Sequence, residues 1–378
     1  MPSSTQTFLP GCELSRRFYW EAVRPLLDLH FPGLPHAAAL IGPGSEVLGF
    51  DAELSMDHDW YPRVQLFLRE EDTGLEAGIR KMLAGGLPHQ FLGFPVDWVP
   101  YAPEPMTRVM AARDEGPVQH GVVALTLSAA VRQWLEWEPG GPLEPADWLT
   151  FPWQVLRSVT SGAVHHDGVG ELTAFRRQMA WYPRDVWLYL LAAGWRRIAQ
   201  EEHLMPRAGY AGDEVGSAVI AARLVRDCMS LCFLMERQYA PYPKWFGTAF
   251  KQLRCAGELS PVLWRALQAS TWQARQEALG EAYEWMARRH NRLAITKPLP
   301  DTVSPYYSRP FQVIHGDRFA ETILEQVTDP AVRRIAERGL IGSIDQFSDS
   351  TDVRSHGSWR PMLKKLYTGE SATRRAEE

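Results

Sequence analysis

The chain has 378 residues, of which 45% are hydrophobic, 22% are charged and 11% are aromatic. This composition excludes an intrinsically disordered protein, and the length favours two domains over one. The formal net charge is −5, but residues 1–130 carry nine Lys and Arg against 16 Asp and Glu. An acidic region of this kind binds a polyanion only through a divalent metal or through basic side chains from elsewhere. An extended nucleic-acid footprint is therefore not favoured, although it stays open.

We expect a cytoplasmic protein without a membrane partner. The first residues lack the charged-then-apolar order of a signal peptide. The longest apolar run, residues 186–195, falls far short of the roughly 20 residues that a membrane-spanning helix needs. The four cysteines are too few and too scattered for a disulfide framework, so we expect free thiols.

The first third of the chain predicts a small mixed α/β unit that ends near residue 135. Its first helix covers residues 14–30, and a short strand over residues 36–41 leads into a Gly-Pro-Gly-Ser turn. A second strand begins near the acidic pair Asp57 and Asp59. The remaining elements are the rest of that strand at 64–68, a helix at 75–83 that Gly85-Gly86 ends, and strands near 91–99 and 122–127.

From about residue 147 the pattern becomes helical. Two long apolar-periodic segments cover residues 184–203 and 213–239, and Asp213 is a good N-cap for the second. Further helices are predicted to begin at Pro243, at Ser260-Pro261, and at a capping box formed by Ser270 and Gln273. Residues 301–360 predict short elements that pack onto the bundle, followed by a disordered tail from residue 369.

The stretch from Gly44 to Trp60 is the most informative about chemistry. A Gly44-Ser45 turn after a strand can present backbone N–H groups and a hydroxyl to phosphate. Asp57 and Asp59 are two residues apart, so on a strand both carboxylates would point to one face, where their repulsion favours a bound cation. The alternative is an Asp-x-Asp pair on a solvated strand face. A phosphate-binding turn beside two metal-binding carboxylates is what metal-assisted nucleotidyl transfer requires.

At these residues the sequence resembles the DNA-polymerase-β-like nucleotidyltransferase superfamily, whose hallmark is Gly-Ser, a gap of roughly ten residues, and Asp-x-Asp. The helical half, with residues 233–250, is similar to a bacterial family known as a domain of unknown function. The resemblance implies an α+β fold, with a small mixed-sheet nucleotidyltransferase domain followed by a large helical bundle. We expect four segments: a nucleotidyltransferase domain at 12–135, a helical substrate-binding domain at 145–300, a C-terminal wrap at 301–365 and a disordered tail at 369–378.

The resemblance also implies roles for individual residues. Gly44 and Ser45 would hold the β- and γ-phosphates of a nucleoside triphosphate, and Asp57 and Asp59 would ligate Mg²⁺ or Mn²⁺. A third carboxylate on a later strand would complete the metal site. Asp97 is the candidate, because the strand near residues 121–127 contains no acid.

Arg223, Arg226 and Ser230 fall near one face of the helix predicted over 213–239. They could form a positively charged surface that complements the acidic catalytic domain. The alternative is structural ion pairing with Asp227 or Glu236.

Lys244 lies in the first turn after Pro243, where the helix dipole disfavours a cation. We interpret it as a phosphate or pyrophosphate contact surrounded by the aromatic residues Tyr239, Tyr242 and Trp245. The alternative is a surface lysine with its aliphatic stem against the protein.

The sequence therefore predicts an enzyme that transfers an NMP group from an NTP, with Mg²⁺, to a hydroxyl of a small molecule, protein or RNA held between the two domains. A second hypothesis is a catalytically reduced nucleotide-binding regulator or partner-binding protein. A third, more distant hypothesis is a helical RNase that uses Arg197 and His203. The segment from His165 to Asp167 contains metal-ligand residue types, but its Gly-rich surroundings favour a loop.

Overall fold

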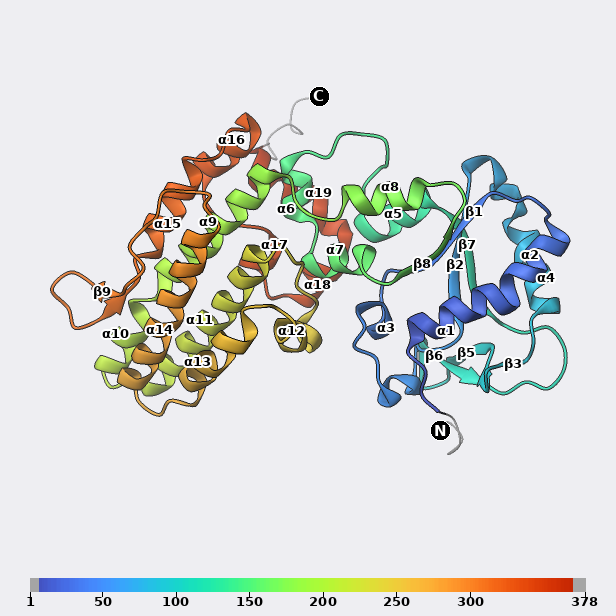
Figure 1. Ribbon diagram of the computed structural model, residues 1–378, viewed down its shortest axis with the longest axis horizontal. Coiled ribbons are helices and arrows are strands. Elements are labelled where there is room, and N and C mark those ends of the chain that lie inside the picture. Colours follow the sequence, from blue (N-terminus) through green and yellow to red (C-terminus); the bar gives the residue numbers. More distant parts are fainter. Residues whose placement is uncertain (1–6, 370–378) are drawn as a thin grey trace, which may run out of the picture. The chain divides into compact units, whose positions relative to one another are not determined.

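The computed structural model describes residues 7–369, so the tail expected at 369–378 lies, apart from Gly369, outside the described residues. The chain divides into two compact units (Figure 1). The first contains residues 1–141 and 155–180, and the second contains residues 142–154 and 181–378. A small sheet domain and a large helical domain are thus confirmed. The boundary expected at 145 needs a correction, because residues 155–180 belong to the sheet domain.

The first unit is built on a four-stranded mixed sheet with the strand order β7-β2-β1-β8. Its strands are β1 (His36–Leu40), β2 (Arg63–Leu68), β7 (Gly121–Thr126) and β8 (Ala163–Asp167). β1 is antiparallel to both β2 and β8, and β2 is parallel to β7. The segment His165–Asp167 is therefore part of an edge strand, and the loop expected there was wrong. The segment is extended because it pairs with β1, and the Gly residues around it carry no information on this tertiary contact.

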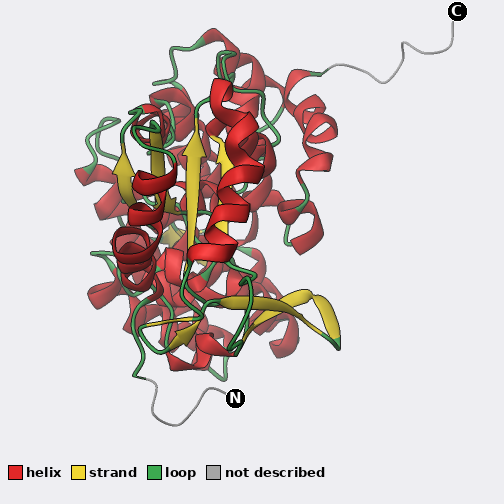
Figure 2. Ribbon diagram, turned by 90° about the vertical axis from the view of Figure 1, so that its right-hand side faces the viewer, coloured by secondary structure: helices red, strands yellow, loops and turns green. Residues whose placement is uncertain are grey.

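Helices pack beside this sheet (Figure 2). The helix expected at 14–30 is confirmed as a continuous run whose middle is a π-helical turn, formed by α1 (Gly11–Phe18), a π-turn (Tyr19–Val23) and α2 (Arg24–His30). The other helices of this unit are α3 (Ser45–Leu48), α4 (Glu76–Gly86), α5 (Leu127–Leu135) and α8 (Glu171–Gln178). Helix α4 continues through Gly85 and Gly86, which were expected to end it.

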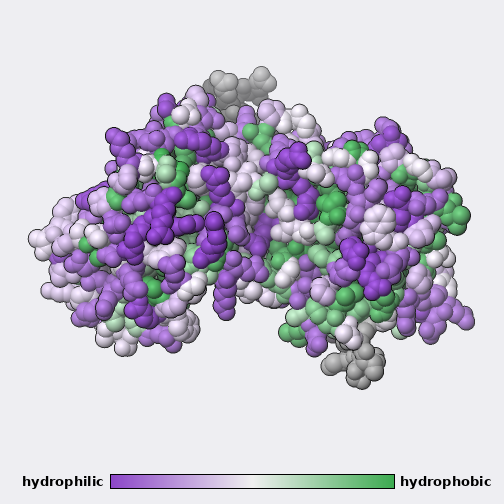
Figure 3. Space-filling view, in the orientation of Figure 1, coloured by the Kyte–Doolittle hydropathy of each residue, from purple (hydrophilic) through white to green (hydrophobic). Residues whose placement is uncertain are grey.

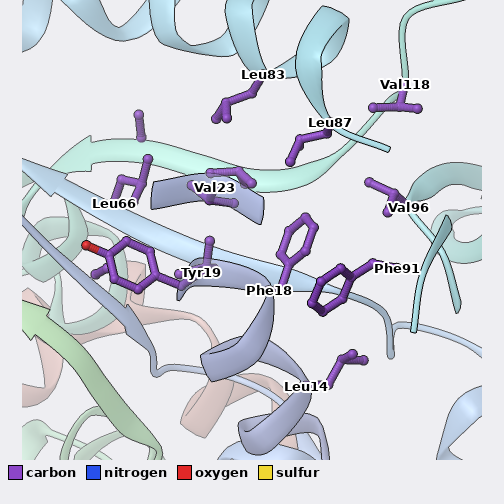
Figure 4. Close-up of a cluster of buried hydrophobic side chains, with 14 of the residues drawn as sticks. Leu14, Phe18, Tyr19, Val23, Leu66, Leu83, Leu87, Phe91, Val96 and Val118 are labelled. Atoms are coloured by element: carbon purple, nitrogen blue, oxygen red, sulfur yellow. The ribbon is translucent and has the colours of Figure 1, made fainter. Parts of the chain in front are cut away.

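The core of the first unit lies between the α1–α2 run, the sheet and α4 (Figure 4). Leu14, Phe18 and Val23 project from the helical run and are fully buried. Phe91 packs edge-on against Phe18, with their ring centroids 5.3 Å apart. Apolar burial on this scale is the main force that holds the N-terminal helices against the sheet.

The strand expected near 91–99 is replaced by two hairpins, and one strand of the second was not predicted. The short pair is β3 (Gln90–Phe91) with β4 (Phe94–Pro95), and the longer pair is β5 (Asp97–Tyr101) with β6 (Glu104–Ala111). Neither hairpin belongs to the four-stranded sheet.

The second unit is a helical bundle. Its longest helices are α9 (Arg184–Glu201), α11 (Glu214–Met235) and α14 (Trp272–Arg292). Helix α11 packs against both α9 and α14. Asp213 is the expected N-cap of α11 and accepts a hydrogen bond from the Gly216 amide. Smaller helices complete the bundle: α6 (Pro145–Thr150), α10 (Leu204–Tyr210), α12 (Pro243–Phe250) and α13 (Ala256–Gln268). Helix α7 (Trp153–Thr160) spans the point where the chain passes from one unit to the other.

Two predicted helix starts are wrong in detail. Helix α13 begins at Ala256 and contains Pro261 in its interior, so Ser260-Pro261 is not a start. The cap of α14 is Thr271, whose hydroxyl accepts from the Ala274 amide, and not Ser270. Both errors are shifts of a few residues within correctly predicted helices.

The C-terminal segment forms the short elements that the sequence predicts. They are β9 (Ser304–Pro305), β10 (Gln312–Val313), α15 (Gly316–Leu324), α16 (Pro330–Arg338), α17 (Ile344–Phe347), α18 (Thr351–Ser355) and α19 (Arg360–Thr368). Helices α15 and α16 pack against α9, and α19 packs against α6. On the face shown in Figure 3, polar side chains cover most of the helical unit. Within residues 7–369, none of the helices combines the length and the apolar character that crossing a bilayer requires.

Candidate functional site

The Gly44-Ser45 turn lies directly after β1, as predicted. Gly44 precedes the short helix α3 and has a φ of 140°, a conformation that side chains rarely adopt. A Cβ atom on Gly44 would lie 2.5 Å from Nη2 of Arg63 and 2.6 Å from a carboxylate oxygen of Glu46. Both the backbone conformation and the space therefore require glycine at this position.

A buried ion pair fixes this turn to the next strand. Arg63, the first residue of β2, donates from Nε to Oε1 of Glu46 at 2.9 Å, and its Nη2 donates to the Pro43 carbonyl at 2.7 Å. Glu46 is only 4% exposed. The sequence analysis missed both residues. The available signal was an acid directly after Ser45 in an apolar run, which needs a cationic partner if it is buried.

The exit of β1 is fixed as well. The side-chain amide of Gln65 on β2 donates to the Ile41 carbonyl at 2.8 Å and accepts from the Ile41 amide at 2.9 Å. Because β1 and β2 are antiparallel, with Ala39 opposite Gln65, the end of β1 and the start of β2 lie at one edge of the sheet. Residues 41–62, which we name the 41–62 loop, therefore begin and end at that edge.

The acidic pair lies in this loop and not on a strand, so the expectation that both carboxylates share a strand face was wrong. Asp57 is the last residue of a 3-10 helix (Glu53–Asp57), and Asp59 adopts a left-handed conformation with φ 51°. The extended strand starts only at Arg63, after Pro62. A left-handed residue interrupts extended backbone, and a proline has no amide to donate to a neighbouring strand. Asp59 and Pro62 therefore prevent β2 from starting before Arg63.

Both carboxylates are exposed, and each has one oxygen engaged. Oδ1 of Asp57 lies 2.8 Å from Nδ1 of the neighbouring His58. Asp59 is tied to β6, since its Oδ1 accepts from the Arg108 amide at 3.1 Å and its own amide donates to the Arg108 carbonyl at 2.9 Å. In the described part of the chain no hydrogen bond engages the Oδ2 oxygen of either residue. The pair therefore keeps oxygen ligands available.

Asp51 organises the middle of the loop, and the sequence analysis did not single it out. Its Oδ2 accepts from the Gly11 amide at the start of α1, at 2.7 Å, and from Nε1 of Trp60, at 3.1 Å. One carboxylate thus joins α1 to both the middle and the end of the 41–62 loop. Its role is to position the segment that carries Asp57 and Asp59.

Asp97 is in a different environment from the acidic pair. It is the first residue of β5, is 2% exposed, and accepts from Nε of Arg113 at 2.9 Å and from the Gln119 amide at 2.6 Å. In the main sheet β2 lies between β7 and β1, and neither of these strands contains an acid. Asp97 thus lies on a later strand, as expected, but on the β5–β6 hairpin and not in the main sheet, and its carboxylate has structural partners.

A magnesium site with three protein carboxylates does not fit this arrangement. Among the residues that the structure describes, no three His, Cys, Asp or Glu side chains are grouped to hold a metal ion. The donor set does fit a site in which two exposed carboxylates share Mg²⁺ with phosphate oxygens of a substrate, which is a common way for proteins to bind this ion. Asp57 and Asp59 are the residues that would hold it.

In the helical unit, the arginines of α11 form ion pairs, although not with the partners considered above. Arg223 lies 2.5 Å from Glu201 of α9, and Arg226 pairs with Asp349. Asp227 instead pairs with Arg197 at 3.1 Å. Helical spacing alone identified Arg223 and Arg226 as cations of one helix, but their partners lie on other elements.

Glu236 and Lys244 each have a local partner in this unit. The carboxylate of Glu236 accepts from the amides of Arg254 and Cys255, both at 2.9 Å. Lys244 lies in the first turn of α12, as predicted, and its side chain is exposed. Its Nζ lies 5.1 Å from the ring centroid of Trp245. The contact between Lys244 and a nucleotide stays a prediction.

The residues considered for an RNase site (Arg197 and His203) and for a metal site (His165) have structural partners. Besides the ion pair of Arg197 with Asp227, the ring of His203 stacks on Tyr306 with centroids 4.5 Å apart. His165 lies 2.9 Å from the Ser15 hydroxyl, and burial lowers the pKa of His165 to about 4. All four cysteines are free thiols, as expected.

Residues 148–246 match the model of a family described as a domain of unknown function, DUF4037. The match agrees with the resemblance of the helical half to a family of unknown function. It begins before α7, includes the edge strand β8 of the first unit, and continues through α9 and α11 of the second. No curated protein and no solved structure matches the chain. The 41–62 loop lies outside the matched residues, so its interpretation depends on its own geometry.

Proposed function

We propose that the first unit binds a nucleoside triphosphate with Mg²⁺ at the 41–62 loop and transfers its NMP group to a hydroxyl of an acceptor. The observation that carries this proposal is the position of the two motifs. The Gly44-Ser45 turn follows β1 and the pair Asp57 and Asp59 precedes β2, within one loop that begins and ends at the same edge of the sheet. A phosphate-binding group and a metal-binding group at one edge are the two requirements of nucleotidyl transfer.

The residues of the loop have distinct tasks in this proposal. The Ser45 hydroxyl and the backbone around Gly44 bind phosphate oxygens, and the ion pair of Arg63 with Glu46 keeps that backbone in place. Asp57 and Asp59 contribute the carboxylate oxygens that hold the metal. Mg²⁺ held there would supply the positive charge that stabilises developing negative charge on the phosphate oxygens. The hydrogen bonds of Asp59 to β6 hold its carboxylate in a fixed orientation.

A second candidate function is nucleotide binding without transfer. The observation that favours it is the engagement of Asp97 by Arg113 and Gln119, which leaves the acidic pair without the third carboxylate that helps to deprotonate the acceptor in the superfamily it resembles. In this case the 41–62 loop would act as a nucleotide sensor. The two candidates share the nucleotide site and differ in turnover.

One experiment separates the candidates. The protein is incubated with each α-labelled NTP and Mg²⁺ or Mn²⁺, alone and with fractions of a cell lysate as the source of acceptor. Transfer of label to a lysate component supports the transferase. Tight metal-dependent NTP binding without transfer in any fraction supports the nucleotide-binding protein. Absence of both binding and transfer overturns the proposal.

A further inference from the structure

The helical unit contains a pocket that the proposed function does not use. Its volume is about 320 Å³, which is within the range of small-molecule sites. Its polar lining includes Arg226 and Ser230 of α11, Asp345 of α17 and Arg354 of α18. Trp153, Phe246 and two prolines of the 241–243 turn contribute apolar wall. All of these residues belong to the second unit.

Arg354 is the residue that points to a ligand. It is 8% exposed, and within the described residues its Nε has no hydrogen-bond partner. Its Nη2 donates to the Asp349 carbonyl over a long 3.4 Å, and its Nη1 lies 3.7 Å from Asp345, beyond hydrogen-bond distance. A buried guanidinium with five N–H donors is costly when its donors are left unmatched. An oxyanion in the pocket would supply acceptors to those guanidinium N–H donors of Arg354 that line it.

Arg354 forms an ion pair with Asp345, both side chains being 8% exposed, but the two groups do not hydrogen-bond. Oδ2 of Asp345 accepts from the Trp153 amide at 2.8 Å, so this carboxylate is oriented by the backbone of α7. Asp349 pairs with Arg226, but its own side chain is 74% exposed. Because Asp349 can turn into solvent at little cost, its ion pair is one that an incoming anion can replace.

We propose that this pocket binds a small phosphate monoester with a planar apolar body, such as a nucleoside monophosphate. Arg354 and Arg226 bind the phosphate, with the Ser230 hydroxyl as a further donor. Two guanidinium groups and a hydroxyl suit the several acceptor oxygens of phosphate better than the two of a carboxylate. Trp153 and Phe246 contact the planar body. The site is separate in sequence from the 41–62 loop and does not depend on its proposed chemistry.

The test measures binding of AMP to the full chain by calorimetry in EDTA, so that metal-dependent binding at the 41–62 loop does not contribute. Inorganic phosphate, adenosine and benzoate are the comparison probes. We expect AMP to bind at one site per chain and at least tenfold more tightly than any of the three. Preferential binding of benzoate, or no binding of AMP up to millimolar concentration, would overturn the proposal.

Variants then locate the site. Arg354→Met and Arg226→Met should each weaken AMP binding at least tenfold, and Asp349→Asn should tighten it several-fold by releasing Arg226. A purely structural ion pair would not produce the gain in Asp349→Asn. Arg288→Met, which removes a half-exposed arginine of α14, is the matched control and should change nothing.

Arg226 lies at the surface of α11, so its variant keeps the test valid even if Arg354→Met does not fold. Loss of AMP binding in Asp57→Asn but not in Arg226→Met would place the nucleotide at the loop and contradict the pocket assignment. Because no metal is present, failure here leaves metal-dependent transfer unaffected, and the two proposals can fail separately.

Discussion

Arg63 and Glu46 form an ion pair that joins the first residue of β2 to α3, next to Gly44. Glu46 is 4% exposed and the side chain of Arg63 is 17% exposed, so the charges depend on each other for compensation. The same guanidinium also holds the Pro43 carbonyl. This pair therefore ties the Gly-Pro-Gly-Ser segment and the start of α3 to β2.

Removing one partner of this pair should destabilise the first unit. Arg63→Met leaves Glu46 buried without a cation, and we expect a loss of about 3–5 kcal/mol in the free energy of unfolding. The double variant Arg63→Met with Glu46→Gln should recover part of that loss, because no unpaired charge remains. Urea denaturation of the four proteins of this cycle checks the prediction. If the losses of Arg63→Met and Glu46→Gln instead add up to the loss of the double variant, the pair is not coupled.

Gly44→Ala should reduce both stability and NTP binding. The added Cβ meets Arg63 and Glu46 at under 3 Å and must be accommodated at a φ of 140°. Gly49→Ala is the matched control, because Gly49 also has a positive φ, of 71°, but no atom within 4 Å of an added Cβ. We expect about 1 kcal/mol of destabilisation in the control, from backbone strain alone, and clearly more in Gly44→Ala. If thermal unfolding shows the same loss of stability in both variants, the added Cβ at Gly44 does not clash with Arg63 and Glu46.

Asp97→Asn should act on stability and not on the nucleotide. Asp97 is buried against Arg113 and the Gln119 amide, so the variant loses a charged acceptor and should be destabilised by roughly 2–4 kcal/mol. Arg113→Met should give a comparable loss. In the folded fraction of Asp97→Asn, metal-dependent NTP binding should match that of the wild type. A selective loss of metal affinity in a stable Asp97→Asn protein would instead restore the role of Asp97 as a ligand.

Titration of Asp345 should make the helical unit more stable at acidic pH than at neutral pH. Burial raises the pKa of Asp345 from 3.8 to about 6, while the Trp153 amide and Arg354 act in the opposite direction. The native state therefore holds a proton between about pH 4 and pH 6 that the unfolded state has lost, so this group makes stability fall as pH rises through that window.

Comparison of the wild type with Asp345→Asn isolates this contribution from other titrating groups, including His165 and His290, whose lowered pKa values act in the opposite sense. The stability of the wild type relative to the variant should fall by up to about 3 kcal/mol between pH 3.5 and pH 7.5. A pH-independent difference in urea denaturation would contradict the assignment.

The sequence was sufficient to predict the elements whose signal is local. The apolar runs at 36–41 and 64–68 gave β1 and β2, and Asp213 correctly marked the start of α11. Strand β8 escaped prediction because His165, His166 and Asp167 are polar and become a strand only through pairing with β1. Asp57 and Asp59 were assigned to a strand because pattern reasoning could not detect the left-handed conformation at Asp59.

The remaining features depend on contacts between distant positions. The pocket brings together Trp153, Arg226 and Arg354, and each of these residues is more than 70 positions from the next along the chain. Arg226 was identified from helix periodicity, but its partner Asp349 lies in the C-terminal segment. Local patterns report which face a side chain shares with its neighbours and give no information on which other element covers that face.

The central claim is that Asp57 and Asp59 hold a metal-bound NTP at the 41–62 loop. Its most direct test is calorimetric titration of each NTP, with and without Mg²⁺, into the wild type, Asp57→Asn, Asp59→Asn and the control Asp114→Asn, an exposed acid of the same unit. We predict Mg²⁺-dependent binding in the wild type and in Asp114→Asn, and at least a tenfold loss, about 1.4 kcal/mol, in the two other variants with their fold retained. Binding in Asp57→Asn and Asp59→Asn that equals the wild type in affinity and metal dependence would contradict the claim.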